Sequence, residues 1–151
     1  MAILKIVTEK EDNAFLRKVS RPVTEITPRI ITLLDDMVET MRNADGVGLA
    51  AVQVGILRRI VVIETEPGQV WELINPEIIS REGVQEGPEG CLSFPGESGV
   101  VRRPMKVTVR AMNRDGEAFE LTGTELLARA ICHETDHLDG HLYTDFVIRQ
   151  D

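Results

Sequence analysis

Two histidines four residues apart are the feature of this sequence most able to carry chemistry. The segment reads His133-Glu134-Thr135-Asp136-His137, and the chain has three histidines in all. On an α-helix, residues four apart project about 40° from one another, so both imidazoles can bind one metal ion. Glu134 lies about 100° from His133 and could act beside the metal as a general base. The alternative is a helix with two surface histidines among solvated acids.

A metal held by two histidines needs a third protein ligand, and the residues near His137 offer only weak candidates. A glutamate on a later helix, as in thermolysin-like sites, is disfavoured because few residues follow His137. A metzincin would have its third histidine where this chain has Tyr143. His141 follows Gly140, where we expect the helix to end, so an exposed loop position is expected for it. Cys132 projects about 100° away from His133 and is expected to be a small core residue.

Cys91 is the remaining soft ligand. It lies in the glycine-rich segment Glu86-Gly87-Pro88-Glu89-Gly90-Cys91-Leu92-Ser93, where the backbone can approach a ligand closely, although a plain turn would also fit. Two histidines and one cysteine leave a fourth position open, which is typical of a catalytic metal. Two rivals remain. One is a metallopeptidase of another type, and the other is a structural metal module with Cys132 or His141 as fourth ligand.

A second glycine-rich segment reads Gly46-Val47-Gly48-Leu49-Ala50-Ala51-Val52-Gln53. Its letters match the loose dinucleotide fingerprint, but that motif needs a strand before the glycines and a helix after them. Here a predicted helix precedes the segment and a β-branched run follows it, so we reject nucleotide binding. The segment is either a glycine loop whose backbone and Gln53 amide face a ligand, or a simple helix-to-strand turn.

Composition limits the classes of protein to consider. With 151 residues, 42% hydrophobic and 28% charged, the chain is expected to form one globular domain over residues 1–151. A net charge of −8 argues against a broad nucleic-acid-binding face, although Arg102, Arg103 and Lys106 could form a local basic patch. The start of the chain lacks the apolar core of a signal peptide, and no run is long enough to span a membrane. Two cysteines do not suggest a disulfide framework, so we expect a cytoplasmic protein.

The elements that must position these residues follow from periodicity. Thr27 and Pro28 begin an amphipathic helix that ends near residues 43–46. Strands are expected at 59–63, at 70–74 with a stop at Asn75-Pro76, and at 106–112, followed by a turn and a short strand near Phe119 and Leu121. A second helix is expected after Leu121, with a capping box of Thr122 and Glu125 and with Gly140 as its end.

This order of elements predicts an α+β fold. Mixed or antiparallel sheets should pack around the C-terminal metal-binding helix, with an amphipathic helix nearer the N-terminus.

Together, the three motifs make the sequence resemble the peptide deformylase family. That family has a Gly-x-Gly-x-Ala-Ala-x-Gln stretch, a Glu-Gly-Cys-Leu-Ser stretch and a His-Glu-x-x-His helix. This chain has them in the same order, at Gly46–Gln53, Glu89–Ser93 and His133–Gly140. The opening residues Phe15–Val19 and Pro22-Val23 are also similar to family openings. The resemblance therefore covers nearly the whole chain.

The resemblance implies an enzyme that removes the formyl group from formyl-methionine of new polypeptides and releases formate. Cys91, His133 and His137 would bind one divalent metal, with Fe²⁺ native and Zn²⁺, Ni²⁺ or Co²⁺ able to substitute. Glu134 would be the acid/base, and Gln53 with the backbone N–H of Leu92 would donate to the oxyanion. An extended peptide could pair with the backbone of the glycine segments as an added strand. The residues expected to bind the substrate are therefore Gly46, Val47, Gly48, Glu89 and Gly90.

The chain departs from the family pattern at two positions and after the metal helix. Cys132 replaces a common glutamine, and Ser98 replaces an arginine near the substrate, so the surroundings of the metal and the edge of the groove could differ. The chain ends soon after the predicted helix and lacks the extension that some members use to meet the ribosome. Transient ribosome contact is the one further partner considered, and neither a membrane nor direct nucleic-acid binding is expected.

Overall fold

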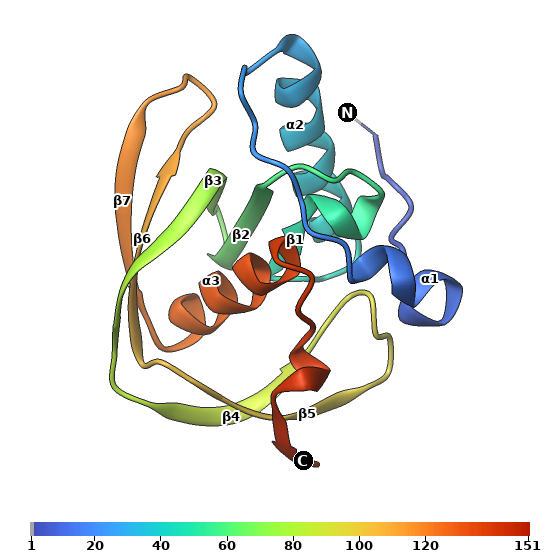
Figure 1. The fold of residues 1–151 in the computed structure, drawn as a ribbon, viewed down its shortest axis with the longest axis vertical. Coiled ribbons are helices and arrows are strands. Elements are labelled where there is room, and N and C mark those ends of the chain that lie inside the picture. The colour runs from blue at the N-terminus through green and yellow to red at the C-terminus, as the bar shows by residue number, and fades with distance from the viewer. Residues whose placement is uncertain (1) are drawn as a thin grey trace.

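The chain folds into two antiparallel sheets around one long buried helix, as a computed structural model that describes residues 2–151 shows (Figure 1). The larger sheet has the order β1-β2-β3-β6-β7, with strands Gly48–Ala50, Ile60–Glu66, Gln69–Glu82, Lys106–Met112 and Ala118–Thr124. The smaller sheet has the order β4-β5-β8, with strands Gln85–Gly90, Ser98–Arg103 and Val147–Arg149. The helices are α1 (Glu9–Leu16), α2 (Pro28–Asn43) and α3 (Glu125–Leu138), with short 3₁₀ turns at Ala51–Val54 and Tyr143–Asp145. The predicted α+β class with antiparallel sheets is confirmed.

Strand β2 shows how the large sheet supports helices on both of its faces. Successive side chains of a strand point to opposite faces. Val61 and Ile63 pack in one apolar cluster with Ile131 and Leu138 of α3. Ile60 and Val62 pack in another cluster, which contains the inner stripe of α2, namely Leu34, Met37 and Met41. The β-branched run is therefore buried on both sides, and it fixes α3 on the face of the sheet opposite α2.

The start of α3 differs from the prediction. The helix begins at Glu125, after Thr124, and not at a capping box of Thr122 and Glu125. Thr122 is a residue of β7, and its hydroxyl lies 2.8 Å from that of Thr108 on the neighbouring strand. The alternation of buried and exposed side chains in β7 continues for three residues beyond Leu121. Strand pairing therefore outweighed the local capping signal. Gly140 does follow the helix end, with φ of +78°.

Strand β3 does not stop at Asn75-Pro76, as the sequence had indicated, but continues to Glu82. Asn75 adopts φ of +52°, and the register to β6 shifts between Ile74 and Glu77. The Asn75 side chain accepts a hydrogen bond from Val23 N and donates one to Val23 O, both at 2.8 Å. Asn-Pro thus marks a bulge within a long strand, where the missing N–H of proline is tolerated.

Two further expectations need correction. Helix α1 was not anticipated from the sequence. The three basic residues Arg102, Arg103 and Lys106 do not form a free patch, since they pair with Glu86, Glu89 and Glu82, respectively. Between residues 2 and 151, none of the helices has both the length and the apolar character needed to span a bilayer.

Candidate metal centre

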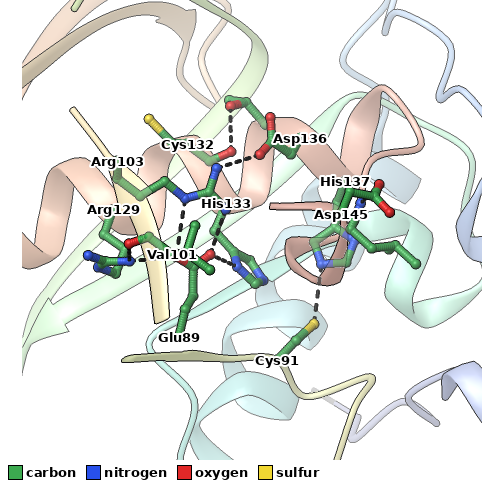
Figure 2. Close-up of polar contacts among 12 residues, drawn as sticks. Glu89, Cys91, Val101, Arg103, Arg129, Cys132, His133, Asp136, His137 and Asp145 are labelled. Carbon is green, nitrogen blue, oxygen red and sulfur yellow. Dashed lines mark hydrogen bonds and ion pairs between the residues drawn. The ribbon is translucent and has the colours of Figure 1, made fainter. Parts of the chain in front are cut away.

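The two histidines of α3 lie next to a cysteine that follows a strand of the smaller sheet. His133 and His137 are buried on one face of α3, with ring centroids 5.1 Å apart. Cys91 follows β4 directly, and its Sγ lies 3.3 Å from His137 Nε2 (Figure 2). One donor atom from each of the three residues lies within 4.8 Å of the others. The cysteine is therefore brought from 42 positions away to the ligand pair on the helix.

This donor set fits a divalent transition metal. Thiolate and imidazole ligands suit zinc and iron, and three protein donors leave a position open for water or substrate. Glu134 Oε1 is buried and has no hydrogen-bond partner in residues 2–151. An orphaned carboxylate oxygen beside three metal donors is what a bound water would satisfy. Cys132 and His141 are not part of the cluster, which disfavours a structural module with four protein ligands.

The ring of His133 is fixed by Glu89. Nδ1 of His133 donates to Glu89 Oε1 at 2.6 Å, which leaves Nε2 free for a metal. Arg103 donates to both Glu89 oxygens, at 2.6 and 3.1 Å, and Arg129 donates to Oε2 at 2.8 Å. Arg103 also reaches Asp136 at 2.7 Å (Figure 2). A carboxylate that orients a ligating imidazole is a recurrent feature of metal sites.

The contact of Glu89 with His133 was missed in the sequence, where Glu89 was assigned to substrate binding. Its side chain points into the space between β4 and α3 and is only 5% exposed. Burial acts to raise the pKa of this carboxyl, but the hydrogen bonds and charges of His133 and Arg103 lower it to about 2. Arginine partners come from β5 and α3, far along the chain, so no local spacing could have revealed the network.

The three titratable residues of α3 at the centre are perturbed in different directions. Burial raises the pKa of Glu134 to about 7, although the charge of His133 acts against this. Burial and the charge of His133 hold the pKa of His137 well below its usual value, which favours the neutral imidazole that a metal needs. Burial also opposes the charged form of His133, but Glu134, Cys91 and Glu89 together hold its pKa well above the usual value.

Gln53 is held beside the cysteine by the 3₁₀ turn that follows β1. Its Oε1 accepts from Ala50 N at 2.9 Å, which orients the amide. Its Nε2 lies 3.4 Å from Cys91 Sγ and 3.1 Å from Ser93 Oγ. The predicted glycine loop is in fact the short edge strand β1 followed by this turn, and the Gln53 side chain is buried against the centre.

The glycines of the first motif are required by close approach. A Cβ on Gly48 would lie 2.5 Å from Glu134 Oε2, and one on Gly46 would lie 2.6 Å from Leu92 Cδ1. The backbone of β1 therefore touches the carboxylate of α3, and only a residue without a side chain permits this distance.

A cavity of about 410 Å³ opens onto the centre. Ten of the eleven residues singled out in the sequence line it, namely Gly46, Val47, Gly48, Gln53, Glu89, Gly90, Cys91, Leu92, His133 and Glu134. The eleventh, His137, is 1% exposed and is not a lining residue, but it belongs to the donor cluster. Leu126, Arg129 and Ala130 of α3 also line the cavity and had not been identified from the sequence.

Comparison with known proteins agrees with this geometry. Residues 3–151 match the family model described as polypeptide deformylase. A peptide deformylase of Alkaliphilus metalliredigens is 59% identical over 150 residues, covering 99% of this chain and 100% of the relative. A peptide deformylase of Caldanaerobacter subterraneus subsp. tengcongensis is 62% identical over 134 residues, covering 89% of this chain and 84% of the relative.

Solved structures give the same result. A peptide deformylase crystal structure from Legionella pneumophila superposes with a TM-score of 0.91 at 43% identity, covering 97% of this chain and 86% of that one. The peptide deformylase structure from Thermotoga maritima superposes with a TM-score of 0.92 at 35% identity, covering 97% of this chain and 99% of that one. Members of this family are metal-dependent hydrolases that remove the N-formyl group from newly synthesised polypeptides. The chain belongs to the polypeptide deformylase family.

Proposed function

We propose that the cavity between β1, β4 and α3 is the active site, in which the formyl group of an N-formyl-methionyl polypeptide is hydrolysed to formate. The observation that carries this proposal is the cluster of Cys91, His133 and His137 beside a buried carboxylate oxygen of Glu134 that has no partner in residues 2–151. We assign the whole of residues 1–151 to one catalytic domain.

A formamide is unreactive, so the site must supply a nucleophile, stabilise an oxyanion and protonate an amine. Cys91, His133 and His137 would hold a divalent metal, which when bound would supply an acidified water and polarise the formyl oxygen. Glu134 takes the proton of the water at its carboxylate and later delivers it to the leaving nitrogen. A pKa raised by burial to about 7 suits a group that must both accept and return a proton near neutral pH.

Gln53 and the backbone N–H of Leu92 donate hydrogen bonds to the developing oxyanion. The Gln53 Nε2 is already positioned beside Cys91, and its Oε1 is anchored on Ala50 N. A preorganised donor of this kind typically contributes about 2.7 to 4 kcal/mol to the transition state. An anionic thiolate ligand would make a bound metal less electrophilic than a third imidazole would, so the dipoles of Gln53 and Leu92 would carry part of the stabilisation.

The substrate backbone binds between two free sheet edges. β1 is the edge of the large sheet and β4 the edge of the small one, and residues of both line the cavity. An extended peptide can add to such an edge through main-chain hydrogen bonds. Gly46, Val47 and Gly48 on one side, with the backbone of Glu89 and Gly90 on the other, are the residues assigned to this role.

The working metal that we propose is Fe²⁺, with Zn²⁺, Ni²⁺ or Co²⁺ able to replace it. A mixed thiolate and imidazole donor set accepts all of these ions, so the donors alone do not select one.

We further propose that the protein acts in the cytoplasm and meets the ribosome transiently, where formylated chains emerge. The net charge of −8 makes a tight, RNA-based contact unfavourable, which agrees with a transient encounter.

The test is formate release by Glu134→Gln. The amide keeps the size of the side chain but has no basicity, so metal content should be retained while turnover falls by about 10²-fold or more. The matched control is Glu125→Gln, which alters an exposed carboxylate in the first turn of the same helix. Formate release near the wild-type rate by metal-loaded Glu134→Gln would contradict the proposal.

A further inference from the structure

Helix α3 extends the active-site cavity beyond the metal donors. Leu126, Ala130 and His133 recur at four- and three-residue intervals, so they share one face of the helix, and all three line the cavity. Arg129 borders the same stretch and also lines the cavity. The cavity therefore runs from the reacting centre toward the N-terminus of α3.

This geometry places the first side chain of the substrate, and the step rests on the proposed function. With the formyl carbon at the metal donors, a rise of about 1.5 Å per residue puts Ala130 roughly 4.5 Å from His133 along the axis, and Leu126 roughly 10 Å away. An unbranched side chain such as that of methionine can pass over the small Ala130. Its tip then ends beside Arg129 and the half-exposed Leu126 at the mouth.

Arg129 is held rigidly but has donors to spare. Its Nη1 donates to Glu89 Oε2 at 2.8 Å and to Val101 O at 3.2 Å (Figure 2). A Cβ on Gly87 would lie 3.3 Å from Nη2, so the guanidinium lies against the backbone of β4. Arg129 is only 7% exposed, and neither Nε nor Nη2 donates to any group in residues 2–151.

The residue that carries these unused donors lines the cavity. A guanidinium has five N–H groups in a fixed plane, and the two acceptors on Glu89 and Val101 both use Nη1. Neither Nε nor Nη2 is among the side-chain atoms that are fully buried without a partner. Each therefore keeps some contact with solvent, and a ligand that presents an oxygen at this end of the cavity would satisfy it.

We propose that Arg129 is a specificity-determining residue, which lets the site accept a hydrogen-bond acceptor at the tip of the substrate's first side chain. The chemical class is an N-formyl peptide whose first residue is methionine sulfoxide, in addition to the ordinary thioether. Oxidation of methionine adds a single polar oxygen to the side chain. In an apolar pocket that oxygen would lose its hydrogen bonds, whereas here the guanidinium replaces them.

The test compares two peptides that differ by this oxygen, formyl-methionyl-alanyl-serine and its sulfoxide, on metal-loaded enzyme. In the wild type, kcat/KM for the sulfoxide should lie within about tenfold of that for the thioether, because a charged donor replaces the lost water. Arg129→Met should lower the ratio of sulfoxide to thioether kcat/KM by about tenfold or more, mainly through KM. The control Arg102→Met, which removes an exposed arginine paired with Glu86, should leave the ratio unchanged.

The ratio separates specificity from a purely structural role. Loss of the Glu89 contact in Arg129→Met would slow both peptides equally and would not move the ratio, so an unchanged ratio overturns the inference. If Arg129→Met does not fold, the wild type decides alone, since discrimination against the sulfoxide by more than about tenfold overturns the inference as well. No formate from formyl-methionine in the metal-loaded wild type would instead contradict the proposed function.

Discussion

The carboxylate of Glu89 orients the ring of His133. Its Oε1 lies 2.6 Å from His133 Nδ1, and both residues are more than nine-tenths buried. The same carboxylate receives Arg103 and Arg129, so four charged or polar side chains from β4, β5 and α3, each less than a tenth exposed, meet beside the cavity. This arrangement connects the small sheet to the metal-binding helix through charged groups, and the Arg103–Asp136 ion pair adds a second such connection.

The first prediction concerns the stability that Glu89 provides. Glu89→Ala should lower the free energy of unfolding by about 3 to 5 kcal/mol, because it leaves the buried guanidinium of Arg129 without a counter-charge and that of Arg103 with Asp136 alone. It should also weaken metal retention by about 10- to 100-fold through the loss of the His133 partner. Chemical denaturation of the metal-free protein and a metal titration measure the two effects.

The matched control for this prediction is Glu120→Ala. Glu120 pairs with Arg110 between β6 and β7, and both side chains are more than half exposed. An exposed pair typically contributes 1 kcal/mol or less, so its removal should barely move the denaturation curve. Equal losses in the free energy of unfolding in the two variants would show that the Glu89 network stabilises the protein no more than an exposed ion pair does.

A second prediction follows from the contact of β1 with α3. Gly48→Ala introduces a Cβ that would lie 2.5 Å from Glu134 Oε2, so the carboxylate must move. A displacement of about 1 Å at a catalytic group can cost about 10²-fold in rate. We expect kcat to fall by this order while metal content and melting temperature change little. A fully active Gly48→Ala would mean that Glu134 does not need its observed position.

The ligand helix and the relative placement of its side chains could be predicted from the sequence because they are local. His133, Glu134 and His137 lie within one turn or so of α3, and Gly140 ends it, so helix geometry alone fixes their relation. The amphipathic pattern from Pro28 to Asn43 is equally local, and that helix was found with its Thr27 cap, which accepts from Ile30 N. Cys91 needed a different argument, from its residue type and from resemblance to a family.

What sequence reasoning missed depends on contacts between distant segments. The partners of Glu89 come from β5 and α3. The positions of Arg103 and Arg129 in the sequence do not indicate that both bind the same carboxylate. The bulge at Asn75 is stabilised by Val23, which is 52 residues away, so the local Asn-Pro signal alone suggested a strand end. Strand β4 carries two glycines and a proline, and pairing with β5 made it a strand despite this composition.

The third prediction distinguishes the two cysteines. Cys132 is 5% exposed, and burial raises the pKa of its thiol to about 11, so at pH 8 it should be neutral and inaccessible. Cys91 is only partly buried at the edge of the cavity. Iodoacetamide should therefore label Cys91 of the metal-free protein within minutes and leave Cys132 intact until denaturant is added. Peptide mapping by mass spectrometry measures both sites in one sample.

Metal loading provides the control for this experiment. A ligated Cys91 should be protected from iodoacetamide, whereas Cys132 should be unaffected by the metal. Likewise, Cys91→Ser should retain far less metal than Cys132→Ser, because a neutral hydroxyl replaces a thiolate poorly. Equal labelling of the two thiols, or equal metal content in the two variants, would contradict the assignment of Cys91 as the ligand.

The last prediction concerns the identity of the metal. A thiolate beside ferrous iron at an open, water-accessible position is exposed to oxygen and peroxide, which can oxidise both the iron and Cys91. Protein prepared anaerobically with Fe²⁺ should therefore release formate rapidly and lose activity on brief aeration, whereas a Ni²⁺ form should persist. A Zn²⁺ form should be stable but slower, because zinc with three protein ligands prefers a tetrahedral site and resists a fifth ligand. Initial rates of formate release at matched metal content, before and after aeration, measure this order. If aerobically purified protein carries zinc and turns over as fast as the anaerobic ferrous form, iron is not the working metal.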